Sequence, residues 1–252
     1  MIAAIVPAHN EAALIGACLQ SLQKAARHPG LAGEEVRILV GLDRCSDATE
    51  AVCAHFGVDM LHLDAGCVGV ARARLVENAL EQGARWICCT DADTVVPDDW
   101  FAAQLACSAE AFCGVVQVDD WEGYARSVRR RFARSERARD GHRHVHGANM
   151  GFSAAAYLRA GGFQPLNCGE DVALIDAIER AGCEVARLGA PRVTTSARRE
   201  ARAPNGFSHF LKCLEAEASH CGGDSPRISP IPSAQAGKEA PATGIGLIPE
   251  WA

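Results

Sequence analysis

The stretch Trp86-Ile87-Cys88-Cys89-Thr90-Asp91-Ala92-Asp93 decides the fold class. Its first five residues are predicted to form a buried strand, and two carboxylates follow where that strand ends. Three similar strand-like runs precede it, and a segment with apolar residues at helical spacing follows each of them. The strands are expected at residues 2–9, 36–42 and 58–63, and the helices at residues 11–28, 46–56 and 68–82. This alternation predicts an α/β fold with a mostly parallel, Rossmann-like central sheet flanked by helices.

The regular alternation ends near residue 110. Beyond it we expect strands at 111–118, 146–153, 185–188 and 193–195, and helices at 122–139, 172–180 and 207–218. From Gly222 onward the chain is rich in Pro, Gly, Ser and Ala. We therefore expect one domain over residues 1–220 and a disordered tail over residues 221–252.

The composition narrows the class of protein. With 252 residues, 48% of them hydrophobic, the chain can build a real core. A net charge of −6 argues against general nucleic-acid binding, which needs a basic surface. None of the 12 cysteines form a C-x-x-C pair, and many lie within apolar runs. There is no charged leader and no apolar run long enough to cross a bilayer, so we expect a reduced, soluble, cytoplasmic protein.

Polar residues follow three of the predicted strands, at 7–11, 43–47 and 91–93. Because ligands of α/β sheets bind beyond the carboxyl ends of the strands, these segments should converge on one site. No G-x-G-x-x-G follows the first strand, so the dinucleotide-binding fingerprint is missing. Carboxylates in place of glycines indicate that Mg²⁺ or Mn²⁺ screens the ligand's phosphates. Taken alone, Asp91-Ala92-Asp93 is also typical of an ordinary turn.

A series of motifs in a fixed order resembles a known family. They are residues 5–11 (IVPAHNE), Asp43 with 46–49 (SDAT), 71–74 (ARAR), 91–93 (DAD), 147–152 (GANMGF), 161–163 (GGF) and 169–171 (GED). Over roughly residues 1–215 the chain resembles the inverting family 2 glycosyltransferases of the bacterial soluble type, which have a GT-A fold. The resemblance implies sugar transfer from a nucleotide-sugar donor, with Mn²⁺ or Mg²⁺ as cofactor.

The same resemblance implies a role for each matching residue. The nucleotide pocket would be lined by Pro7, His9 and Glu11, and Asp43 would accept a hydrogen bond from the base. Arg72 would lie near the donor phosphates. Asp91 would face the ribose or the sugar, and Asp93 would hold the metal. Asp171, which follows Glu170, matches the catalytic base, although a carboxylate there is also typical of a helix N-terminus.

The chain departs from the family pattern at its C-terminal end. It lacks the Gln-x-x-Arg-Trp motif of processive members, which argues against a polysaccharide synthase. Arg198 and Arg199 are expected to clamp donor phosphates, with a solvated basic turn as the alternative. His209 is a candidate further metal ligand, with a structural or solvated histidine as the alternative.

Two clusters have more than one interpretation. The alternating histidines His142, His144 and His146 suggest either a metal site or a strand that is exposed or lines the acceptor pocket. The arginine-rich segment 126–143 suggests a solvated helix face, an anionic acceptor site or peripheral contact with a membrane.

The donor is expected to be a UDP-sugar, and the sequence does not identify the acceptor. The competing functions are a metal-dependent sugar nucleotidyltransferase and a non-catalytic sugar-nucleotide binding protein.

Overall fold

A computed structural model describes residues 1–121, 123–136, 138–199 and 206–220. Contacts divide the chain into one compact unit, Met1–Ser219, and a second unit, His220–Ala252. The tail expected over residues 221–252 lies outside the described residues. No helix in the described part combines the length and apolar content that a membrane crossing requires.

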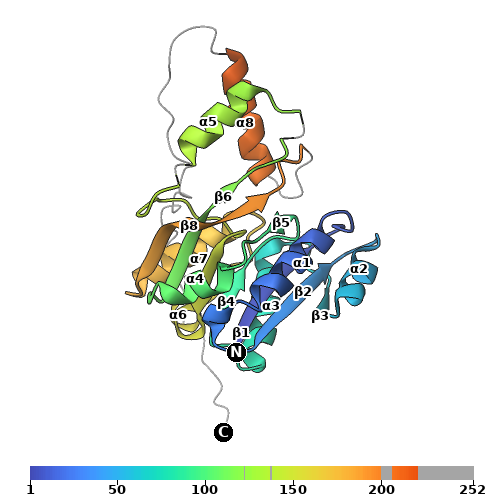
Figure 1. Ribbon diagram of the computed structural model, residues 1–252, viewed down its shortest axis with the longest axis vertical. Helices are drawn as coiled ribbons and strands as arrows, with labels where there is room; N and C mark the ends of the chain where they lie inside the picture. Colours follow the sequence, from blue (N-terminus) through green and yellow to red (C-terminus); the bar gives the residue numbers. More distant parts are fainter. Residues whose placement is uncertain (122, 137, 200–205, 221–252) are drawn as a thin grey trace, which may run out of the picture. The chain divides into compact units, whose positions relative to one another are not determined.

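The described chain forms an eight-stranded sheet of order β3-β2-β1-β4-β7-β6-β8-β5 (Figure 1). The first four strands in this order are parallel to one another, β7 runs antiparallel to both of its neighbours, β6 and β8 are parallel, and β5 is antiparallel to β8. The predicted α/β sheet is confirmed, with parallel pairing concentrated in its N-terminal half. The strands are β1 (Ile2–Ala8), β2 (Val36–Asp43), β3 (Asp59–Leu63), β4 (Trp86–Cys89), β5 (Thr94–Val95), β6 (Ala111–Gln117), β7 (Met150–Ser153) and β8 (Val185–Thr195).

Helices cover both faces of this sheet because its central strands are apolar on both sides. Along β1, Ile2, Ala4 and Val6 belong to one buried cluster, whereas Ala3 and Ile5 belong to another. The first cluster includes side chains of α1, α4, α5 and α8, and the second includes side chains of α3, α6 and α7. The helices are α1 (Ile15–Ala25), α2 (Thr49–Phe56), α3 (Val68–Glu81), α4 (Trp100–Ala106), α5 (Arg126–Ser135), α6 (Ala154–Ala160), α7 (Glu170–Arg180) and α8 (Phe207–His220), with a 3₁₀ turn at Pro29–Leu31.

Several predicted boundaries were wrong. The helix expected over residues 11–28 begins only at Ile15, because Asn10 takes a left-handed conformation (φ 55°) and the Glu11 amide donates to Thr49 Oγ1 (2.8 Å). The strands expected at 185–188 and 193–195 are one strand, β8, which pairs along β6 with a register shift between Cys113 and Val115. The helix expected over 122–139 spans only Arg126–Ser135, with residues 122 and 137 outside the described part. The elements β5, α4 and α6 were not predicted, because each of them is short.

One buried amide joins the antiparallel part of the sheet to α4. The side chain of Asn149 is fully buried, and its Oδ1 accepts from Trp100 Nε1 (2.9 Å). Its Nδ2 donates to the carbonyl oxygens of Val115 and Pro191, each at 2.9 Å. The neighbouring strand must pass close by, since a Cβ atom at Gly114 would overlap this amide.

We expect Asn149→Ala to lower the free energy of unfolding by about 3 kcal/mol or more, because it leaves three buried groups without a partner. Urea denaturation would measure the change. Asn78→Ala is the matched control, since among the described residues the side chain of the partly exposed Asn78 bonds only Gln82, and its loss should change stability by about 0.5 kcal/mol or less. Equal stability of the two variants would contradict the assigned role of Asn149.

Candidate active site

Most of the predicted site residues lie around the carboxyl ends of β1, β2 and β4. These three strands are neighbours and parallel, so Ala8, Asp43 and Cys89 end at the same edge of the sheet. The segments after these ends carry the polar residues that the sequence singled out. Glu170 and Asp171 at the N-terminus of α7 and Gly147 before β7 complete the site.

Arg72 is the buried centre of one half of the site. It lies on α3 with only 4% of its side chain exposed. Nη2 donates to Asp91 Oδ1 (2.6 Å), just beyond β4, and Nη1 donates to Glu170 Oε1 at the start of α7. Gly147 lies directly against this guanidinium, because a Cβ atom there would overlap both terminal nitrogens. The placement of Arg72 near the donor phosphates stays a prediction; in the structure its guanidinium is shared by two carboxylates.

The two carboxylates at the start of α7 have different surroundings. Glu170 is buried, and burial together with the charge of Asp171 raises its pKa, whereas Arg72 acts in the opposite direction. Asp171 is half-buried; its Oδ2 accepts from the Gly147 amide (2.7 Å) and its Oδ1 from the Val172 amide (2.8 Å). Asp171 is therefore the carboxylate that a bound molecule can reach, and the backbone sets its orientation.

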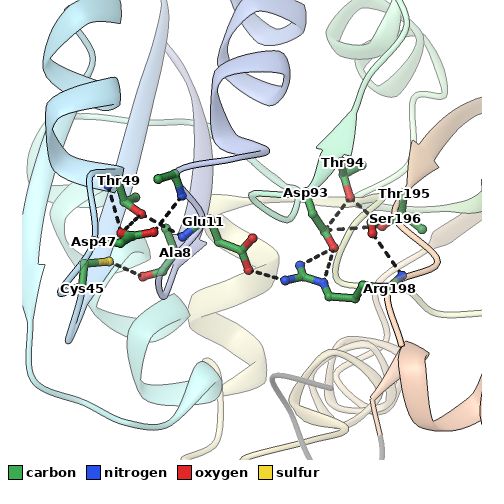
Figure 2. Close-up of polar contacts among 11 residues, drawn as sticks. Ala8, Glu11, Cys45, Asp47, Thr49, Asp93, Thr94, Thr195, Ser196 and Arg198 are labelled. Carbon is green, nitrogen blue, oxygen red and sulfur yellow. Dashed lines mark hydrogen bonds and ion pairs between the residues drawn. The ribbon is translucent and has the colours of Figure 1, made fainter. Parts of the chain in front are cut away.

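Asp93, Glu11 and Arg198 form the other half of the site (Figure 2). Arg198 Nε donates to Asp93 Oδ2 (3.0 Å), and Nη2 donates to the same oxygen. Nη1 donates to Glu11 Oε1 (2.7 Å), so one guanidinium bridges two buried carboxylates. The sequence does not predict that either carboxylate pairs with Arg198.

The segment after β1 is fixed by contacts with the segment after β2, at the left of Figure 2. Asp47 accepts from the Ala12 amide (3.0 Å) and from the Thr49 amide (3.0 Å). His9 Nδ1 donates to the carbonyl oxygen of Asp43 (2.7 Å). These contacts hold Glu11 in a turn rather than in a helix.

Pro7 and Asp43 lie near the ends of the neighbouring strands β1 and β2. Asp43 is buried, and its Oδ1 accepts from the amides of Ala65 and Gly66 at 2.7 and 3.1 Å. Pro7 is half-buried at the end of β1, and His9 is exposed beside it. The three residues thus lie together at the edge where the resemblance places a nucleotide base.

Two predicted site residues have their recorded contacts elsewhere. Arg199 forms an ion pair with Glu215 of α8 (2.5 Å) and stacks over the ring of Tyr124 at 4.3 Å. His209 is exposed on α8, with Nε2 3.4 Å from the Cys213 sulfur. The structure therefore gathers Arg198 into the site, while Arg199 and His209 contact residues of α8 and of the segment before α5.

The amino-acid sequence of the chain matches a known protein family. Residues 3–160 match the sequence profile of glycosyl transferase family 2. The chain belongs to this family. The family and the fold predicted from the ordered motifs are confirmed, and no curated protein sequence matches the chain.

Solved structures of GT-A glycosyltransferases share the fold at low sequence identity. TarS residues 1–349 from S. aureus in complex with UDP-GlcNAc aligns with a TM-score of 0.61 and 14% identity, over 86% of this chain and 66% of that one. The mannosyltransferase PcManGT from Pyrobaculum calidifontis in complex with GDP-Man and Mn²⁺ aligns with a TM-score of 0.57 and 18% identity, over 87% and 70% of the two chains. A mycobacterial protein gives a TM-score of 0.56 at 14% identity, over 87% and 72%. The chain thus spans about two thirds of each of these relatives.

The carboxyl group of Asp93 has a raised pKa. Burial raises the pKa of its carboxyl from the usual 3.8 to about 6, and Asp91 acts in the same direction, while Arg198 lowers it without restoring the usual value. Since the folded protein then holds a proton that the unfolded chain has released, stability should fall as the pH rises through this window.

In metal-free protein we expect the wild type to lose about 3 kcal/mol of stability relative to Asp93→Asn between pH values of about 4 and 6.5. Urea denaturation at several pH values would measure this difference. Asp98→Asn is the matched control, since Asp98 is 60% exposed in its ion pair with Lys24 and should follow the wild-type profile. Parallel profiles for wild type and Asp93→Asn would show that Asp93 has an ordinary pKa.

Proposed function

We propose that this chain transfers a sugar from a nucleoside-diphosphate donor to an acceptor hydroxyl in one inverting displacement. The observation that carries the proposal is that two groups of carboxylates lie at the carboxyl ends of β1, β2 and β4. Asp93 and Glu11 share one cationic partner, and Asp171 presents a backbone-oriented carboxylate. Arg72 joins two segments of the Asp171 grouping, since it bonds Asp91 after β4 and Glu170 at the start of α7.

The residues around Asp93 fit a divalent cation. Its buried carboxylate and that of Glu11 already share a single positively charged group, the guanidinium of Arg198. Mg²⁺ and Mn²⁺ prefer oxygen ligands, and Mg²⁺ typically takes one or two carboxylates together with substrate phosphates. When bound, such an ion would supply charge neutralisation of the leaving diphosphate.

Arg198 would serve the donor by moving from carboxylate to phosphate. A guanidinium binds both groups through the same paired N–H donors, so the exchange keeps its hydrogen bonds. Arg198 is 19% exposed and thus more accessible than Arg72. Pro7, His9 and Asp43 would hold the nucleoside, and Asp91 the ribose or sugar. A UDP-sugar remains our first expectation; the related structures hold UDP-GlcNAc and GDP-Man.

Asp171 would act as the general base. A carboxylate that accepts from two backbone amides is fixed in orientation, and its partial exposure leaves it open to an acceptor hydroxyl. It would take the hydroxyl proton as the oxygen attacks the anomeric carbon, and one such displacement inverts that carbon. Glu170, buried against Arg72, would anchor the helix that carries Asp171.

Donor binding should raise the melting temperature of the protein only when Mn²⁺ or Mg²⁺ is present. A panel of UDP-, GDP- and ADP-sugars at about 100 times Kd should stabilise the fold by about 2.7 kcal/mol, roughly 5–10 °C for a domain of this size. Arg198→Ala should lose most of the shift, because it removes the phosphate contact. Arg199→Ala is the matched control and should keep it, since Arg199 contacts Glu215 and Tyr124 instead. A metal-independent response to every nucleotide would refute the proposed donor site.

Asp171→Asn should lower transfer, or donor hydrolysis when no acceptor is known, by about 10²–10⁴-fold, because the amide cannot take a proton. Release of the nucleoside diphosphate would measure the rate, and the donor-induced melting shift should stay at the wild-type value. Asp176→Asn on the exposed side of the same helix should leave the rate unchanged. Full activity of Asp171→Asn would remove the base assignment, and donor binding without turnover in the wild type would favour a binding protein.

A further inference from the structure

A second group of potential metal ligands lies outside the residues used above. Glu136 follows α5, and its Oε1 lies 3.0 Å from His146 Nε2 and 3.4 Å from His144 Nδ1. The histidines belong to the segment before β7, and their rings stack with planes 12° apart and centroids separated by 5.9 Å. The sequence pattern points to these histidines but not to the carboxylate that joins them.

The carboxylate of Glu136 has one oxygen without a partner. Only 5% of this side chain is exposed, yet no described residue forms a hydrogen bond with Oε2. A buried carboxylate oxygen in this state costs free energy, and it needs an explanation such as an ion. The hydrogen bond between His146 and Oε1 does not satisfy it.

The separations of the ligand atoms match metal coordination. The three atoms, one from each side chain, lie within 4.8 Å of one another. In a tetrahedral site with metal–ligand distances of about 2.1 Å, neighbouring ligand atoms are about 3.4 Å apart. The two distances from Glu136 Oε1 are close to that value, and an ion held by both oxygens of this carboxylate would also satisfy Oε2. Imidazole ligands suit Zn²⁺ and its transition-metal neighbours, whereas Mg²⁺ and Mn²⁺ suit oxygen ligands.

The third histidine, His142, uses both ring nitrogens in hydrogen bonds to the backbone. His142 is buried, its Nε2 donates to the Leu188 carbonyl oxygen (3.1 Å), and its Nδ1 accepts from the His144 amide (3.1 Å). Both ring nitrogens are therefore engaged. The contact with the His144 amide also helps to hold the ligand-bearing segment.

We propose that Glu136, His144 and His146 bind one zinc-class divalent ion, at a site separate from the Asp93 carboxylates. Three protein ligands leave a fourth position for water or for an oxygen of a bound molecule. His146 precedes Gly147, whose amide holds Asp171, so the ion would fix the segment that orients this carboxylate. The proposal rests on these ligands alone and does not depend on the transferase reaction.

The test uses the full chain in an Asp93→Asn background after EDTA treatment, which removes the carboxylate site from the measurement. Titration with Co²⁺ should give one equivalent of bound ion with visible ligand-field bands and no near-ultraviolet thiolate band, and Zn²⁺ should displace it. Glu136→Gln, His144→Ala and His146→Ala should each weaken binding at least tenfold. His62→Ala is the matched control, because His62 forms an exposed pair with Glu50 (3.4 Å) and should keep wild-type affinity.

Two results would overturn the proposal. The first is the absence of Co²⁺ and Zn²⁺ binding in the Asp93→Asn protein, which would leave a hydrogen-bonded cluster without metal affinity. The second is a thiolate band, which would place the ion on cysteines. Neither result depends on whether the ligand variants fold, and neither touches donor binding or turnover, so the proposed function is tested separately.

Discussion

The buried guanidinium of Arg72 is the interaction on which the site depends. It joins the helix α3, the acidic segment after β4 and the first turn of α7, and it does so with almost no contact with water. Removing one partner of a buried ion pair typically costs about 3–5 kcal/mol, because a charge is left uncompensated. Gly147 is part of the same arrangement, since any side chain there would occupy the space of the guanidinium. The buried guanidinium of Arg72 thus fixes the positions of both Asp91 and Glu170.

The two arginines of the site have complementary properties. Arg72 is held by two carboxylates in the interior, while Arg198 reaches Asp93 and Glu11 from beyond the end of β8 with part of its side chain in solvent. A fixed charge suits positioning, and an accessible one suits exchange between ligands. The raised pKa of Asp93 fits this division, because a poorly compensated buried carboxylate favours the arrival of another cation.

The sequence predicted those features that depend on local pattern or on ordered motifs. The strand–helix alternation predicted the parallel half of the sheet, and the motif order predicted the family. It did not predict that Arg198 binds Asp93 and Glu11, since these contacts span 105 and 187 residues and no periodicity encodes such distances. Glu136 was missed for a similar reason, because it faces His146 from ten residues away across an irregular segment. The motif placed Arg72 near the donor phosphates but did not predict its burial or its two carboxylate partners, because a motif indicates a residue's neighbourhood and not its depth in the fold.

The bridge from Arg198 to Glu11 also has a consequence for synthesis of the protein. A ribosome releases the chain from its N-terminus, so the segments with Glu11 and Asp93 emerge long before the residue that balances their charge. A nascent chain that stops short of position 198 can pair β1, β2 and β4, yet it holds two close carboxylates without their arginine. The carboxylates of Glu11 and Asp93 are therefore neutralised by Arg198 only late in synthesis. A chain that ends before Arg198 should contain the strands of the sheet but keep these two carboxylates without their cation.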